Sequence, residues 1–170
     1  YEYPRRQPAD GQKLIPYLAS KYSDKASWEA RRDTLRKEVR ERLGIDALLA
    51  RCSNEKPLVG KTRKYDGYTV QNFCMKTVDG HTVKGSVYTP LAKGKHPLIV
   101  CPNGHFLNGR YGKVQQQRLA TLARMGAICV DYDLWGWGES EDEVGAKAHQ
   151  TAEAQQMQAL NGIRILDWMI

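Results

Sequence analysis

The sequence predicts an α/β fold in which an antiparallel hairpin leads into a mostly parallel sheet with flanking helices. Two stretches, Leu98–Cys101 and Ala127–Tyr132, are short, apolar and rich in β-branched residues, which is typical of strands buried on both faces of a parallel sheet. Between them, Lys113–Arg124 has helical apolar spacing that includes Val114, and Gly126 ends it. This order of strand, helix and strand forms a right-handed crossover. The loops that follow the two strands therefore lie at one edge of the sheet, where α/β proteins bind ligands.

Residues 1–64 are predicted to form a basic, helical N-terminal extension. They contain 16 Lys and Arg and 9 Asp and Glu, so the whole formal charge of +7 lies there. Residues 1–19 show no clear period and are expected to be an extended lead-in. Trp28–Leu43 has helical apolar spacing after Ser27, which can cap it, and a short helical piece at 46–51 precedes a polar connector. Acidic residues interleave with the basic ones at helical spacings, so we interpret the helix as solvated and expect no nucleic-acid partner.

A hairpin follows, and a long helix ends the sequence. Tyr68–Thr77 and Thr82–Tyr88 have strand-forming compositions, and the Asp79-Gly80 pair between them is typical of a two-residue hairpin turn. The last helix, at about 148–170, has a broad apolar face and carries no stop signal. We therefore expect the fold to continue beyond it.

Composition excludes several classes of protein. No apolar run approaches the roughly 20 residues that span a bilayer, so no membrane span is expected. The four cysteines contain no Cys-x-x-Cys pair and are predicted to be buried thiols. Cys101 and His105 have no second pair of ligands at a suitable spacing, so neither a metal site nor another cofactor is expected.

The order of the motifs resembles the N-terminal half of the α/β-hydrolase fold. One buried strand ends in Pro102-Asn103-Gly104-His105, and the next is followed by a loop that runs from Asp131 through two glycines to Ser140. Over about residues 24–169 the sequence is similar to bacterial acetyl xylan esterase-like carbohydrate esterases. The shared segments are Trp28–Arg32, Asp66–Tyr68, Asn103–His105, Asn108–Arg110, Gln115–Arg118, Leu122–Ala127, Ile163–Arg164 and Leu166–Asp167.

The resemblance implies a serine carboxylic-ester hydrolase that acts on acylated or methyl-esterified plant polysaccharide. It makes residues 65–170 the N-terminal half of the hydrolase domain, ending before the nucleophile elbow. The chain contains no Gly-x-Ser-x-Gly, and Ser140 ends a Gly-rich loop, so we interpret Ser140 as a turn residue. The nucleophile, base and acid are then expected beyond Ile170, the main partner is the remaining half of the domain, and this chain alone is expected to be inactive. The resemblance also implies a periplasmic or secreted protein.

In such enzymes a loop N–H contributes to the oxyanion hole, and the resemblance places that donor after Leu98–Cys101. We expect the N–H of His105 to serve, with that of Phe106 as the second choice, because Gly104 lets the backbone approach closely. The other interpretation of His105 is an ordinary loop residue whose ring is hydrogen-bonded. Asp131 is expected to bond to its own loop.

Substrate-binding residues are expected on the same two loops, because both follow strands that end at one edge. Aromatic faces suit sugar rings, and an arginine suits a carboxylate such as that of a uronic acid. The tryptophans could equally be packing residues that hold the loops. The candidates are Phe106, Asn108, Arg110, Trp135 and Trp137.

Two other functions stay open. One is a non-catalytic carbohydrate-binding or interaction module, from which the enzyme would be distinguished by a following strand with Gly-x-Ser-x-Gly. The other, a polyanion-binding protein, rests only on the net charge.

Overall fold

The computed structural model describes residues 7–170. The chain divides into two compact units, Tyr1–Leu43 and Gly44–Ile170. The expected boundary was after residue 64. The difference arises because Leu48, Leu49 and Cys52 pack into a cluster with the last helix. Residues 44–64 therefore belong with the sheet.

The first unit contains two helices, α1 (Pro8–Ala19) and α2 (Lys25–Arg42). The prediction of an extended lead-in was wrong for Pro8–Ala19, where a proline begins the helix and the Gln7 N–H donates to the Asp10 carboxylate at 2.9 Å. Helix α2 begins earlier than expected, because Asp24 rather than Ser27 is the N-cap. The Ser27 N–H donates to Asp24 Oδ1 at 2.8 Å, and the Asp24 N–H donates to Ser27 Oγ at 3.1 Å.

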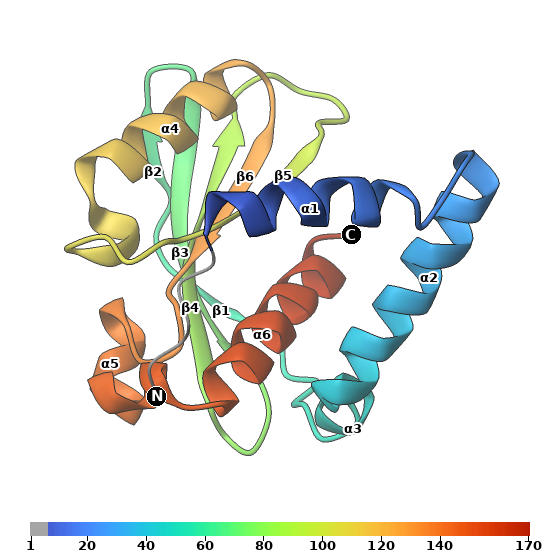
Figure 1. Ribbon diagram of the computed structural model, residues 1–170. Helices are drawn as coiled ribbons and strands as arrows, with labels where there is room; N and C mark the ends of the chain where they lie inside the picture. The colour runs from blue at the N-terminus through green and yellow to red at the C-terminus, as the bar shows by residue number, and fades with distance from the viewer. Residues whose placement is uncertain (1–6) are drawn as a thin grey trace. The chain divides into compact units, whose positions relative to one another are not determined.

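The second unit is built on a six-stranded sheet with the order β1-β3-β4-β6-β5, in which β2 also pairs with β3 (Figure 1). Strands β5 and β6 are parallel, and all other pairs are antiparallel. The strands are β1 (Leu58–Val59), β2 (Arg63–Tyr65), β3 (Tyr68–Lys76), β4 (Thr82–Pro90), β5 (Leu98–Pro102) and β6 (Ile128–Tyr132).

The predicted hairpin and crossover are both confirmed. Strands β3 and β4 pair from Tyr68 opposite Pro90 to Lys76 opposite Thr82, and Asp79, in the turn, has a φ of 54°. Strand β5 runs beside β6 with Leu98 opposite Ile128. The connecting helix α4 (Lys113–Arg124) has the predicted bounds.

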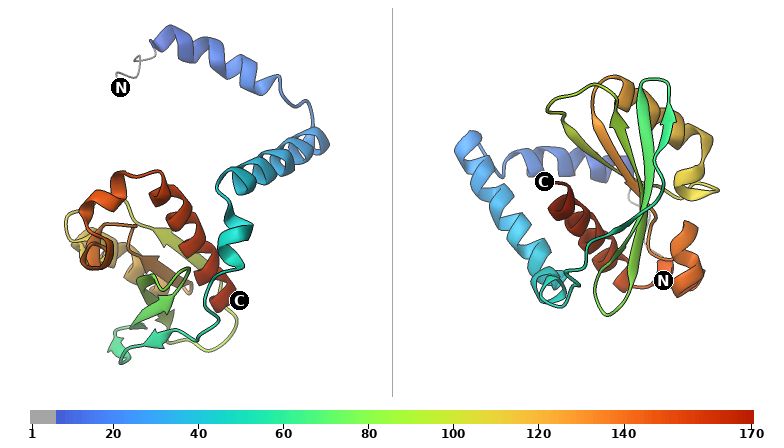
Figure 2. Two further views of the ribbon diagram at one scale, coloured as in Figure 1. Left: turned by 90° about the horizontal axis from the view of Figure 1, so that it is seen from below. Right: turned by 180° about the vertical axis from the view of Figure 1, so that it is seen from behind.

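Helices cover both faces of this sheet, α4 on one and α6 (Glu153–Met169) on the other (Figures 1 and 2). Strand β6 is buried on both faces: Cys129 packs in the α4 cluster, whereas Val130 and Tyr132 pack with Ile165 of α6. One detail of the prediction was wrong, because Val114 is 72% exposed and lies off the buried side of α4.

The shorter elements are α3 (Ile45–Leu49), η1 (Gly109–Tyr111), η2 (Gly138–Ser140), α5 (Glu141–Val144) and η3 (Ala146–Gln150). All four cysteines are free thiols, and the prediction that they are buried is confirmed for Cys101 and Cys129 but not for Cys52 and Cys74, which are half-buried. Among residues 7–170, no helix combines the length and the apolar character that crossing a membrane requires.

Candidate functional site

The two loops that sequence reasoning singled out meet at the carboxyl edge of the parallel strands. Residues 103–112 follow β5 and residues 133–152 follow β6, and the parallel register brings both strand ends together. Glycine is required in the second loop at two positions of positive φ. A Cβ on Gly136 would lie 2.6 Å from the His149 backbone nitrogen, and one on Gly138 would lie 2.7 Å from Asp133 Oδ1.

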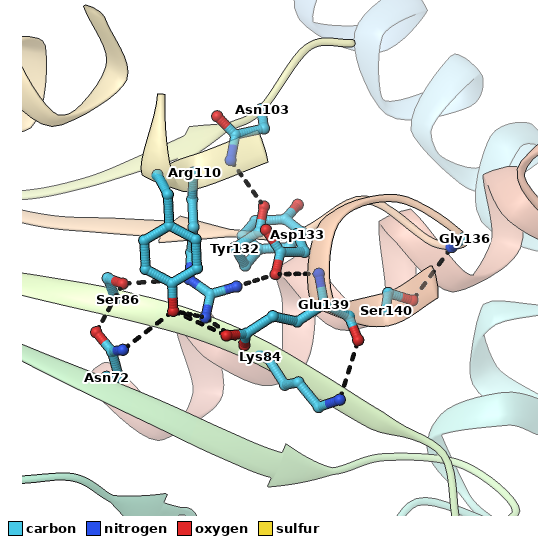
Figure 3. A network of polar contacts seen from close by, with 11 residues as sticks. Asn72, Lys84, Ser86, Asn103, Arg110, Tyr132, Asp133, Gly136, Glu139 and Ser140 are labelled. Atoms are coloured by element: carbon cyan, nitrogen blue, oxygen red, sulfur yellow. Dashed lines mark hydrogen bonds and ion pairs between the residues drawn. The ribbon is translucent and has the colours of Figure 1, made fainter. Parts of the chain in front are cut away.

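A buried arginine ties these loops to the sheet (Figure 3). Arg110 is 2% exposed, and its guanidinium is paired with the equally buried Asp133 and with Glu139 at 2.5 Å. Its Nε donates to Ser86 Oγ on β4 at 3.3 Å, and its Nη2 also donates to the Tyr111 hydroxyl at 2.7 Å. Arg110, expected to bind a substrate carboxylate, is thus engaged by carboxylates of the protein itself.

The same contacts set the charge of Glu139. Partial burial alone would raise the pKa of this carboxyl, but the hydrogen bond and positive charge of Arg110 bring it below the usual value. The Tyr111 hydroxyl donates to Glu139 Oε1 at 2.9 Å, and Lys84 Nζ donates to the Glu139 carbonyl at 3.0 Å. The cluster therefore holds both loops through ionised groups.

The backbone N–H groups of His105 and Phe106, the two candidate oxyanion donors, differ in their hydrogen bonding. The Phe106 N–H already donates to the Gly104 carbonyl at 2.9 Å. For the His105 N–H, the described part of the chain offers no hydrogen-bond acceptor. Of these two candidates, the His105 N–H is therefore the one without an acceptor within residues 7–170.

The His105 ring contacts a residue that sequence reasoning missed. His105 Nε2 lies 2.5 Å from His149 Nε2, and His149 Nδ1 lies 2.7 Å from the Trp135 carbonyl. Because a carbonyl only accepts, His149 carries a proton on Nδ1, and in the neutral pair His105 donates from Nε2. Trp137 packs edge-on against His105, with ring centroids 5.5 Å apart, and its Nε1 donates to the Phe106 carbonyl at 3.0 Å.

The predicted substrate residues divide into exposed and buried groups. Phe106 is 45% exposed, and Asn108 lines an open hollow of about 390 Å³ beside Tyr111 and Glu139. Trp135 is only 2% exposed and packs with residues of α6. For Trp135 this matches the packing role that the sequence analysis left open.

Ser140 and Asp131, which lie in or near the loops of the candidate site, are both buried. Ser140 is buried and its hydroxyl accepts from the Gly136 N–H at 3.1 Å, as expected of a turn residue. The expectation for Asp131 was wrong. Neither of its carboxylate oxygens has a partner in the described structure, and burial raises the pKa of Asp131 to about 7.

The partners that sequence reasoning missed carry only weak sequence signals. Asp133 and Glu139 flank the two glycines, but nothing in the sequence pairs them with Arg110. His149 lies in a polar stretch before α6 and has no motif. Within residues 7–170, no group of three His, Cys, Asp or Glu side chains is placed to hold a metal ion.

Neither the protein-family models nor the curated proteins include a match to this sequence. Solved structures do match. Methylesterase BT1017 is 62% identical with a TM-score of 0.93, and the match covers 99% of this chain and 38% of that one. A protein from Bacteroides fragilis NCTC 9343, to which an acetyl xylan esterase activity is attributed, is 16% identical with a TM-score of 0.58, over 78% of this chain and 43% of that one.

The similarity to the Bacteroides fragilis protein supports the fold alone, whereas methylesterase BT1017 is similar in both fold and sequence. The chain spans about two fifths of the length of either structure. The strand order, the parallel β5–β6 crossover and the helices on both faces agree with the α/β-hydrolase arrangement inferred from the motifs. This chain therefore has the fold of the carbohydrate esterases of the α/β-hydrolase class, over part of their length.

Proposed function

We propose that this chain is part of a serine carboxylic-ester hydrolase that acts on esterified plant polysaccharide. It would supply the oxyanion loop and part of the substrate pocket, and the nucleophile, base and acid would come from the rest of the domain. The observation that carries the proposal is the open N–H of His105, on a loop that Arg110 and Trp137 hold in place.

The chemistry follows from the charge that an ester gains during attack. When a serine oxygen adds to the carbonyl carbon, negative charge collects on the carbonyl oxygen. An N–H that already points at this oxygen stabilises it without reorganisation, an effect of about 3 kcal/mol per donor. His105 would contribute through its main chain. The exposed Phe106 and Asn108 and the half-buried Trp137 would contact the sugar, while Arg110 and Trp135 would act from beneath by fixing the loops.

Between acyl and methyl esters, we favour a methyl ester, because the structure with 62% identity is named a methylesterase. The product is then a carboxylate on the polysaccharide and methanol. By resemblance, such an enzyme would be exported to the periplasm or beyond it.

The test uses the natural protein that carries these residues. It is incubated with methyl-esterified polygalacturonate and, separately, with acetylated xylan, and the release of methanol and of acetate is measured. We expect methanol from the first substrate, and loss of that activity after treatment with a serine-directed fluorophosphonate. Release of neither product, or activity that survives the reagent, would contradict the proposal.

A companion measurement uses residues 1–170 alone. We expect no turnover of p-nitrophenyl acetate above background, since the expected nucleophile is not among these residues. A Ser140→Ala variant is the control. Turnover by the chain that disappears in this variant would make Ser140 the nucleophile and refute the assignment.

A further inference from the structure

A partly open cavity lies on the α4 side of the sheet, beside strands β2, β3 and β4. Its volume is about 220 Å³. That is below the roughly 300–1,000 Å³ of pockets for drug-sized ligands, so it suits one ring rather than a chain. The lining side chains that could contact a ligand through a ring, hydroxyl, amide or guanidinium include Arg63, Tyr65, Tyr68, Tyr88, Tyr111 and Gln116.

One wall of this cavity is a stack of three tyrosines from three strands. The Tyr65 and Tyr68 rings are 5.2 Å apart at 13°, and the Tyr68 and Tyr88 rings are 5.9 Å apart at 18°. Flat aromatic surface of this kind suits the apolar face of a sugar ring. The stack therefore favours a ligand that is cyclic and polar at its rim.

The hydroxyls of this stack are the second observation. Tyr68 and Tyr88 are 9% and 5% exposed as whole residues. Within residues 7–170 neither hydroxyl has a hydrogen-bond partner, and neither oxygen is fully buried, so both hydroxyls are open to the solvent in the cavity. Burial raises the pKa of Tyr88 to about 12, so its hydroxyl keeps its proton and can donate. The cavity thus offers unused donors to whatever occupies it.

The rim adds positive charge. Arg63 Nη2 donates to the neutral Asn72 amide oxygen at 2.7 Å, and Arg63 forms no ion pair within the described residues. Arg124 lies outside the lining, 5.1 Å from the centre of the Tyr68 ring, and is paired with the Asp66 carboxylate at 4.0 Å. The nearby carboxylates of Asp133 and Glu139 are both bound to Arg110. A ligand that carries a carboxylate would therefore meet an available guanidinium at Arg63.

We propose that this cavity binds a single carboxylated sugar unit. Its hydroxyls would bond to Tyr68, Tyr88 and Gln116, and its carboxylate to Arg63. The binding site stands on the cavity alone. Its use as a subsite, which would hold an acidic sugar of the polysaccharide during ester hydrolysis, rests on the proposed function.

The test measures binding, not turnover. The natural protein is titrated with D-galacturonate and with the neutral D-galactose by isothermal calorimetry. We expect galacturonate to bind at least tenfold more tightly. Arg63→Gln should remove that preference, whereas Lys64→Gln should keep it, because successive residues of β2 point to opposite faces and the charge change is the same.

A second pair of variants tests the hydroxyls. Tyr88→Phe should weaken both sugars about three- to tenfold, the value of one neutral hydrogen bond. Tyr132→Phe is the matched control, since this equally buried tyrosine packs on the α6 side. If Tyr88→Phe lowers the melting temperature sharply, Tyr68→Phe replaces it.

Three results would overturn the inference: binding of neither sugar, equal binding of both, or a preference that survives Arg63→Gln. If neither sugar binds, the cavity holds only water. The methanol assay is run on the same variants. If the natural protein binds galacturonate as expected but releases no methanol, the proposed function alone is contradicted. If it releases methanol but shows no preference for galacturonate, the binding site alone is contradicted.

Discussion

The assignment of His105 makes a prediction that separates its backbone from its ring. In the natural protein, His105→Ala keeps the N–H and removes the contact with His149. His105→Pro removes the N–H itself. Removal of one oxyanion donor costs about 3–4 kcal/mol, or a factor of about 100 to 1,000 in kcat. We therefore expect kcat to fall within about tenfold in the alanine variant and at least a hundredfold in the proline variant.

The assay is methanol release at saturating methyl-esterified polygalacturonate, so that kcat and KM are resolved. Because proline can also distort the loop, Leu107→Pro is the control. Leu107 is 86% exposed, and the same ring at this position leaves the His105 N–H in place. Thermal melting checks that each variant is folded. If His105→Ala were as inactive as His105→Pro while folded and able to bind substrate, the imidazole itself would be catalytic and the reasoning wrong.

The remaining predictions concern the groups that hold the site. Arg110→Met should lower the free energy of unfolding by about 3–5 kcal/mol in chemical denaturation, because it leaves two carboxylates without their cation; a change below 1 kcal/mol would show that the cluster is not stabilising. Burial raises the pKa of Asp131 to about 7, above its usual 3.9. The folded state thus binds the extra proton, and stability should fall as pH rises from about 4 to 7, by up to about 4 kcal/mol, and then level off. Asp131→Asn should abolish that slope, and an unchanged slope in this variant would assign it to other groups. Gly136→Ala should destabilise the protein more than Gly145→Ala, since both have positive φ but only the Cβ at 136 meets backbone, and equal losses would remove the steric argument.

Local pattern was sufficient to predict the central part of the fold. Helix α4 was predicted to the residue because its apolar spacing and Gly126 agree, and the Asp79-Gly80 turn fixed the hairpin. Helix α1 was missed because Pro16, which normally breaks a helix, lies inside it. The exposed position of Val114 depends on which side of α4 meets the sheet, and that is decided by tertiary packing.

The candidate site was predictable as a place but not as a set of contacts. The ends of two parallel strands locate the loops, and the Gly104 region suggests a close backbone approach. The pairing of Arg110 with Asp133 and Glu139 spans more than twenty residues and depends on how two loops fold over each other. The tyrosine stack depends on the registers of three strands, because only the pairing of β2, β3 and β4 brings the rings together.

The strand order also determines how the sheet can grow. Strand β5 is last in the order and, within residues 7–170, pairs on one side only, with β6. Its outer row of N–H and C=O groups is a template for one more strand. A parallel strand added there would end beside the loop that carries His105, so that the residues following it would lie near the open N–H. The same edge makes the isolated chain prone to pair with copies of itself, and concentration-dependent assembly should therefore be monitored in any experiment on residues 1–170 alone.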